Sequence, residues 1–167
     1  MIAAANPMAA EAGLEILKAG GTAVDAAIAV QAMLGLVEPQ SSGIGGGAFM
    51  LHYDARTGDV VAYDGREVAP MGATPDMFLG KDGKPLPFLD AVQTGRSIGV
   101  PGAVAMLEMA HREHGKLPWA SAWQPAIAMA EKGCPVPPWM ATVIRQAQGM
   151  TRLAPDAQTY VTSPAGT

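Results

Sequence analysis

The sequence predicts an α+β fold that is rich in helices and carries one short β-hairpin. Two observations support this class. The predicted elements follow the order helix, helix, strand, strand and then further helices, whereas α/β folds alternate strands with helices. In addition, 167 residues that are 49% hydrophobic provide one core but are too few for two comfortable domains. Residues 1–167 are therefore expected to form a single domain, or an incomplete part of one.

The first two helices are marked by their capping residues. One helix is predicted to begin at Pro7, after the N-cap residue Asn6, and to end before the pair Gly20–Gly21. A second helix follows Thr22, which forms a capping box with Asp25 in place of the usual Glu. Because this second helix is composed largely of small and apolar residues, we expect it to be mostly buried.

The middle of the chain changes from helical to β patterning. Residues 48–53 and 59–63 are short, apolar and β-prone, and residues 55–58 between them form a predicted hairpin turn. Residues 68–95 are rich in Pro, Gly and Asp and are predicted to cross the surface, with one helical turn at residues 74–79. Helices opened by prolines are expected at residues 101–115, 118–133 and 137–149, and the tail from residue 151 shows no periodicity.

Two strands are too few to form a stable layer between this many helices. We therefore expect the remaining strands to come from elsewhere, so that residues 1–167 are a fragment or one subunit of a larger fold. An open sheet edge and exposed apolar helix faces also predict that the chain self-associates when it is expressed alone.

Composition excludes several classes of function. With 11 Lys plus Arg against 15 Asp plus Glu and no basic run, nucleic acid is not an expected partner. The longest apolar stretch, residues 23–37, is interrupted by Asp25 and Gln31 and is too short for a membrane span. Residues 1–5 lack the basic start of a signal peptide. Cys134 is the only cysteine, so neither an intrachain disulfide nor a Cys-x-x-Cys metal pair is possible, and no cofactor is predicted.

Three patterns have a functional and a structural interpretation, and the structural one is favoured in each. Residues 43–48 satisfy the glycine spacing of a dinucleotide fingerprint, but a helix precedes them and a strand follows, which is the reverse of the required order. We interpret them as a tight turn.

His111 and His114 have a spacing used by metal sites, but no third ligand is evident and the dipole of a helix end explains them. Cys134 is interpreted as a small buried residue rather than a nucleophile.

Arg66 is the one candidate binding residue. It follows the second predicted strand and a glycine, so its side chain is expected to project from the end of the sheet. The planar guanidinium donates two parallel hydrogen bonds to a single carboxylate and stays charged at any working pH. A surface ion pair of Arg66 with Asp64 or Glu67 is the alternative. No catalytic residue and no metal ligand is predicted.

Blocks of sequence in a fixed order extend over nearly the whole chain. They are Ala4–Pro7, Ala10–Gly13, Leu17–Ala27, Glu38–Gly47, Asp64–Glu67 with Ala69 and Pro70, Thr74–Phe78, Gly99–Gly102 and Gly115–Trp119. Together they resemble the beginning of the large subunit of γ-glutamyltranspeptidase, a member of the N-terminal-nucleophile hydrolase superfamily. The resemblance implies a four-layer αββα sandwich built from two subunits of one self-cleaved precursor, which accounts for the missing strands.

The resemblance also implies a chemistry. The nucleophile is a threonine freed at the N-terminus of the small subunit, and its own α-amino group acts as base. The γ-glutamyl group of glutathione or a related amide then passes through an acyl-enzyme to water or to an amino acceptor. Arg66 matches the family's arginine that binds the α-carboxylate of this group. No Thr-Thr-His-like processing site occurs here, so Thr167 is not the nucleophile and residues 1–167 alone are expected to be inactive.

The implied partners are γ-glutamyl substrates, the remainder of the large subunit and the small subunit. By resemblance the location is periplasmic or extracellular, although the lack of a signal peptide leaves the cytoplasm open. Two alternatives remain at this point: a related acylase, similar to cephalosporin acylases or capsule depolymerases, and a noncatalytic truncated binding domain.

Overall fold

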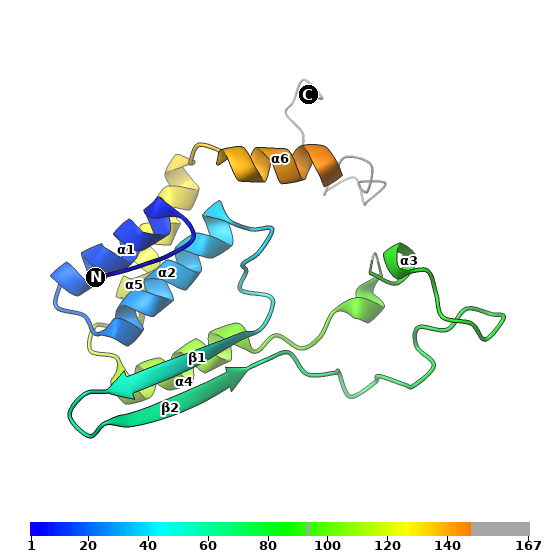
Figure 1. Ribbon diagram of the computed structural model, residues 1–167, viewed down its shortest axis with the longest axis horizontal. Coiled ribbons are helices and arrows are strands. Elements are labelled where there is room, and N and C mark those ends of the chain that lie inside the picture. Colours follow the sequence, from blue (N-terminus) through cyan, green and yellow to red (C-terminus); the bar gives the residue numbers. More distant parts are fainter. Residues whose placement is uncertain (93, 148–167) are drawn as a thin grey trace. The chain divides into compact units, whose positions relative to one another are not determined.

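The computed structural model describes residues 1–92 and 94–147 and confirms the α+β class (Figure 1). The chain divides into two compact units. The first comprises Met1–Met71 and Gly99–Pro135, and the second comprises Gly72–Ile98 and the segment from Val136 onward. The elements are α1 (Pro7–Lys18), α2 (Ala23–Val37), β1 (Ala48–Asp54), β2 (Asp59–Gly65), α3 (Phe88–Val92), a 3-10 helix (Gly95–Ser97), α4 (Ala103–His114), α5 (Trp119–Lys132) and α6 (Pro138–Ala147). None of the described helices combines the length and apolarity needed to cross a membrane.

The starts of α1 and α2 are as predicted. The Asn6 side chain accepts a hydrogen bond from the backbone nitrogen of Met8 at 3.0 Å, and Pro7 opens the helix. Thr22 and Asp25 form the complete capping box. The two helices pack closely at Gly13, where an added Cβ would lie 2.6 Å from Cγ2 of Val30. Small residues at this crossing therefore permit the helix contact.

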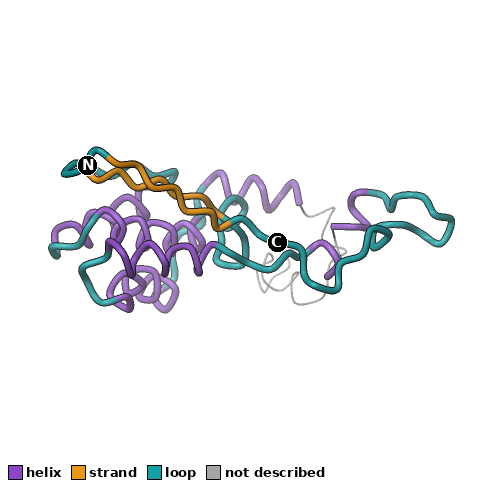
Figure 2. Tube along the Cα trace, turned by 90° about the horizontal axis from the view of Figure 1, so that it is seen from below, coloured by secondary structure: helices purple, strands orange, loops and turns teal. Residues whose placement is uncertain are grey.

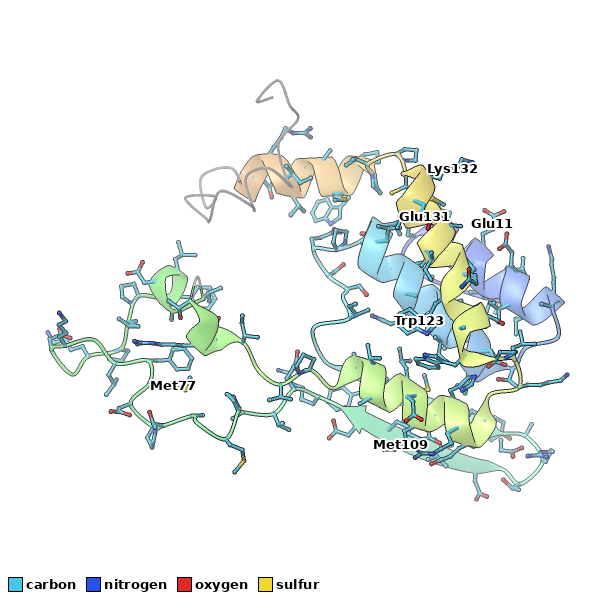
Figure 3. All side chains as sticks on the ribbon, turned by 180° about the vertical axis from the view of Figure 1, so that it is seen from behind. Glu11, Met77, Met109, Trp123, Glu131 and Lys132 are labelled. Carbon is cyan, nitrogen blue, oxygen red and sulfur yellow. The ribbon has the colours of Figure 1, made fainter. Side chains whose placement is uncertain are left out.

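The hairpin packs one face against the helices. β1 and β2 are antiparallel, with Ala48 opposite Gly65 and Asp54 opposite Asp59, and Figure 2 shows the pair running along the helices of the first unit. The core beneath it joins residues of α2, β2, α4 and α5; Trp123 lies between α5 and α2 in Figure 3. Its buried members are Val24, Ile28, Tyr63, Met106, Leu107, Ala110 and Ala122.

The opposite face of the hairpin is apolar and exposed. Phe49, Leu51 and Tyr53 alternate along β1 and are 62–74% exposed, and Val60 on β2 is 61% exposed. Strands normally place alternate side chains on opposite faces, so these residues form one continuous apolar surface. Within the described residues nothing covers it.

The surface segment contains more helix than predicted. A helical turn was expected at residues 74–79, but the structure has only hydrogen-bonded turns there. Instead, α3 and the 3-10 helix lie in a stretch expected to be irregular. Both are short, and the hydroxyls of Thr94 and Ser97 bind nearby carbonyls, a local effect that periodicity does not reveal. The last helix is described as far as Ala147; residues 148–149 and the tail from residue 151 lie outside the described residues.

Asp25 is a fully buried carboxylate that joins distant parts of the first unit. Besides its bonds to Thr22, it accepts hydrogen bonds from the backbone nitrogens of Lys116 at 3.0 Å and Leu117 at 3.3 Å. His111 Nε2 lies 3.4 Å from its other oxygen. Burial alone raises the pKa of Asp25, but the backbone hydrogen bonds of Thr22, Lys116 and Leu117 outweigh it, and the pKa lies below its ordinary value. The start of α2 is thereby fixed to the turn between α4 and α5.

Tyr63 makes a second polar link, between the hairpin and α4. Its hydroxyl donates to Glu113 Oε2 at 2.6 Å and lies 2.7 Å from His114 Nε2. Since the hydroxyl has one proton, His114 donates from Nε2 to the Tyr63 oxygen. The His114 ring also stacks on His52 of β1, with 3.8 Å between centroids. Burial, followed by the contact with Glu113, raises the pKa of Tyr63 to about 12.

We predict that Asp25→Asn destabilises the first unit by roughly 3 kcal/mol, because the new amide NH₂ would be buried against the backbone N–H donors of Thr22, Lys116 and Leu117. The folded-state pKa of Asp25 lies below the unfolded value of 3.8. Its contribution is therefore present above the unfolded pKa and is lost as the pH falls through the folded pKa. Urea unfolding of both proteins at pH 7 and near pH 3 measures this difference. Asp59→Asn, in an exposed strand end, is the control; equal stability of Asp25→Asn and wild type would contradict the prediction.

We predict that Tyr63→Phe costs about 1 kcal/mol of unfolding free energy and abolishes a phenolate absorbance step near pH 12. Because the folded pKa is raised above the ordinary 10.0, the stabilisation is present below pH 10 and is lost as the pH rises through the folded value. Tyr53→Phe, whose side chain is exposed, is the matched control. A Tyr63→Phe protein that keeps the late absorbance step would overturn this assignment.

Candidate functional site

Arg66 is the first residue beyond the end of β2, and its side chain is 71% exposed, as its position after the strand predicted. The chain leaves the strand because the Asp64 side chain accepts a hydrogen bond from the backbone nitrogen of Arg66 at 2.9 Å. Asp64 thus binds the backbone of Arg66 and not its guanidinium. The guanidinium is left at the sheet end, facing solvent.

Glu67 is the acidic neighbour of the guanidinium. Arg66 Nε lies 3.4 Å from Glu67 Oε2, which is an ion-pair distance. The contact is not aligned as a hydrogen bond, and Oε2 of Glu67 is buried without a hydrogen-bond partner among the described residues. Within residues 1–92 and 94–147, neither terminal nitrogen of Arg66 has a hydrogen-bond partner. The predicted surface pairing with Glu67 therefore occupies one edge of the guanidinium and leaves its fork free.

Two other segments converge on the Arg66 region. Val68 and Val100 exchange backbone hydrogen bonds of 3.4 and 2.9 Å. The carbonyl of Gly46 accepts hydrogen bonds from the nitrogens of Gly102 and Ala103, at 3.2 and 3.1 Å. The loop of residues 43–47, called the glycine loop below, is thereby hydrogen-bonded to the start of α4 beside Arg66.

The glycine loop follows α2 and precedes β1, so it has the strand and helix in the order that the sequence indicated. A dinucleotide fingerprint requires a helix N-terminus directly after its glycines, and here a strand occupies that place. None of the glycines from 43 to 47 has a positive φ. Residues 44–46 form a bend between α2 and β1, which agrees with the structural interpretation of this segment. At Gly47 the backbone also approaches Glu67 closely, since an added Cβ would lie 2.9 Å from the Glu67 nitrogen.

His111, His114 and Cys134 have separate structural surroundings. His111 Nε2 donates to the Leu117 carbonyl at 2.9 Å, whereas His114 binds Tyr63, so the two imidazoles face different partners. Among the described residues, no three His, Cys, Asp or Glu side chains are grouped so as to hold a metal ion. Cys134 is partly buried and packs against the cluster formed by α1 and α2.

The arrangement around Arg66 has the charge and the donor groups that an anion requires. A guanidinium stays protonated at working pH. Arg66 can therefore orient and neutralise a carboxylate, but it cannot act as base or nucleophile. Sequence reasoning identified Arg66 but missed the contribution of Gly46 and Gly102. The glycines themselves were visible, but their contact joins positions far apart in the chain, which a periodic pattern does not encode.

Comparison with known proteins identifies the family. A family model described as gamma-glutamyltranspeptidase matches residues 9–167. A glutathione hydrolase proenzyme of Bacillus subtilis is 47% identical over 148 residues, which are 89% of this chain and 25% of that protein. The chain therefore spans about a quarter of the length of this relative.

Solved structures give the same result. The γ-glutamyltranspeptidase of Helicobacter pylori superposes with a TM-score of 0.91 at 34% identity, over 98% of this chain and 46% of that chain. A cephalosporin acylase from Bacillus halodurans superposes with a TM-score of 0.72 at 35% identity, over 88% of this chain and 26% of that one. The predicted fold, part of an N-terminal-nucleophile hydrolase sandwich with a short hairpin, is confirmed by these neighbours. Residues 1–167 belong to the γ-glutamyltranspeptidase family.

Proposed function

We propose that residues 1–167 are the N-terminal part of the large subunit of a γ-glutamyl transferase or hydrolase that cleaves glutathione and related γ-glutamyl amides. The observation that carries this proposal is the match of residues 9–167 to the family, together with the 47% identical glutathione hydrolase proenzyme. In the complete protein, a small-subunit threonine attacks the amide carbonyl and its α-amino group accepts the proton. The amine leaves, and water or an amino acceptor then takes the γ-glutamyl group.

The exposed hairpin face supports the proposal that this chain is completed by other parts of the same precursor. Phe49, Leu51, Tyr53 and Val60 form an apolar surface of a kind that sheets normally bury. The remainder of the large subunit and the small subunit are the proposed partners, and alone the fragment is expected to self-associate and to be inactive. The family resemblance also underlies the proposal that the complete protein acts in the periplasm or outside the cell.

Within this enzyme, Arg66 is proposed to bind the α-carboxylate of the γ-glutamyl group. Its fork is free and solvent-facing, whereas Glu67 contacts only the Nε edge. Two parallel charge-assisted hydrogen bonds to a carboxylate suit this geometry. A related acylase is the second candidate, because the cephalosporin acylase shares the fold. That enzyme class differs in the acyl group it accepts, so the requirement for an α-carboxylate distinguishes the two.

We predict that the product of the complete gene matures into two chains, the second of which begins with threonine. Intact-mass and N-terminal sequence analysis before and after incubation measures this maturation. A single uncleaved chain would contradict the enzyme proposal and favour the alternative of a noncatalytic binding domain.

We predict that Arg66→Ala in the complete enzyme raises KM for a γ-glutamyl anilide about 100-fold, because two charge-assisted hydrogen bonds are lost. Arg66→Lys, which keeps a point charge but not the fork, should raise KM about tenfold. Arg56→Ala is the matched control, since Arg56 is an exposed arginine of the same hairpin that pairs with Asp54. An unchanged KM in Arg66→Ala, or equal cleavage of an acyl anilide that lacks the α-carboxylate, would favour the acylase.

A further inference from the structure

We propose that Gly47 and Gly102 are positioning residues that hold the peptide group between Arg66 and Glu67 from two sides, and so set the direction of the Arg66 side chain. This inference rests on the proposed role of Arg66 in binding the α-carboxylate. Neither glycine contacts the substrate in this proposal; both act through Arg66.

Gly47 lies against the nitrogen of this peptide group. A Cβ added at Gly47 would lie 2.9 Å from the backbone nitrogen of Glu67 and 2.5 Å from its Oε2. Cβ atoms do not approach other heavy atoms this closely, so something must shift. The Glu67 carboxylate can rotate away, but the backbone nitrogen can move only with the chain.

Gly102 lies against the oxygen of the same group. A Cβ added at Gly102 would lie 3.0 Å from the carbonyl oxygen of Arg66 and 2.5 Å from that of Gly65. The Arg66 oxygen and the Glu67 nitrogen belong to one rigid, planar peptide unit. A side chain at either glycine therefore displaces the whole unit, and with it the Cα from which the Arg66 side chain projects.

The two segments that carry these glycines are also hydrogen-bonded to each other. The Gly46 carbonyl, next to Gly47, accepts hydrogen bonds from the nitrogens of Gly102 and Ala103. Neither Gly47 nor Gly102 has a positive φ, so an alanine there is excluded by space and not by backbone conformation. The glycines are needed because the peptide of Arg66 passes between two backbones that approach each other closely.

The test compares alanine variants of the complete, matured enzyme with a γ-glutamyl anilide as substrate. Gly47→Ala should raise KM about tenfold and change kcat less than about twofold, because Arg66 binds a part of the substrate remote from the cleaved bond. Gly45→Ala is the matched control: it lies in the same loop, has no positive φ, and a Cβ there would meet nothing within 4 Å. Its KM should remain that of wild type, and equal KM values for Gly47→Ala and Gly45→Ala would overturn the proposal.

A double-mutant cycle separates positioning from general damage. In an Arg66→Ala background, Gly47→Ala should raise KM no further, because its effect passes through the missing guanidinium. A full tenfold increase in that background would instead show a structural effect and overturn the proposal.

If Gly47→Ala unfolds below the assay temperature, Gly102→Ala replaces it. A Cβ there would lie 3.0 Å from the carbonyl oxygen of Arg66, so this variant should also raise KM several-fold with little change in kcat. An unchanged KM in Gly102→Ala would overturn the proposal. Failure of the proposed function is recognised separately, by a wild-type enzyme that does not cleave the anilide or by an Arg66→Ala enzyme with unchanged KM.

Discussion

The buried carboxylate of Asp25 is the interaction on which the arrangement of the first unit depends. It caps α2 and at the same time accepts the backbone hydrogen bonds of Lys116 and Leu117. Without Asp25 these partly buried donors would lose their acceptor. Lys116 and Leu117 lie in the turn directly after α4, so Asp25 fixes the C-terminal end of α4. The N-terminal end, at Gly102 and Ala103, is held by hydrogen bonds to the Gly46 carbonyl. The position of α4 therefore connects the helical core to the Arg66 region.

The hairpin has two faces with different roles. Its inner face contributes Tyr63 to the core and joins α4 through Glu113 and His114. Its outer face is apolar and open in the described residues, as expected of a strand pair that is one part of a larger sandwich. The proposed completion by the rest of a precursor accounts for both faces, because the inner face is packed within this chain and the outer face is left for the proposed partners.

In the proposed function, substrate binding at the sheet end is separated from the chemical step. Arg66 offers a charged fork suited to a carboxylate, and the proposed nucleophile belongs to another part of the precursor. Such a division requires that the guanidinium be placed accurately relative to the nucleophile in the folded precursor. Close backbone contacts suit that task, because a peptide unit packed between other backbones moves less than a flexible side chain on the surface.

Much of the secondary structure could be predicted from local sequence. The caps at Asn6 and Thr22, the hairpin and the proline-started helices depend on neighbouring residues, whose preferences act over a few positions. The short helix α3 was missed for a related reason, since five residues carry too little periodicity to distinguish them from a loop. Arg66 was predicted because its position after a strand and a glycine is itself a local feature.

The sequence by itself determined the order of elements, the fold class and the presence of an exposed arginine at a strand end. Only the tertiary structure decided that Asp25 accepts hydrogen bonds from Lys116 and Leu117, and that Gly47 and Gly102 enclose the peptide of Arg66. The capping residue Asp25 looks the same in the sequence whether or not it has distant partners, and a glycine required for close approach looks the same as one required for a turn. The physical difference lies in which backbones meet, and packing of the whole unit determines that.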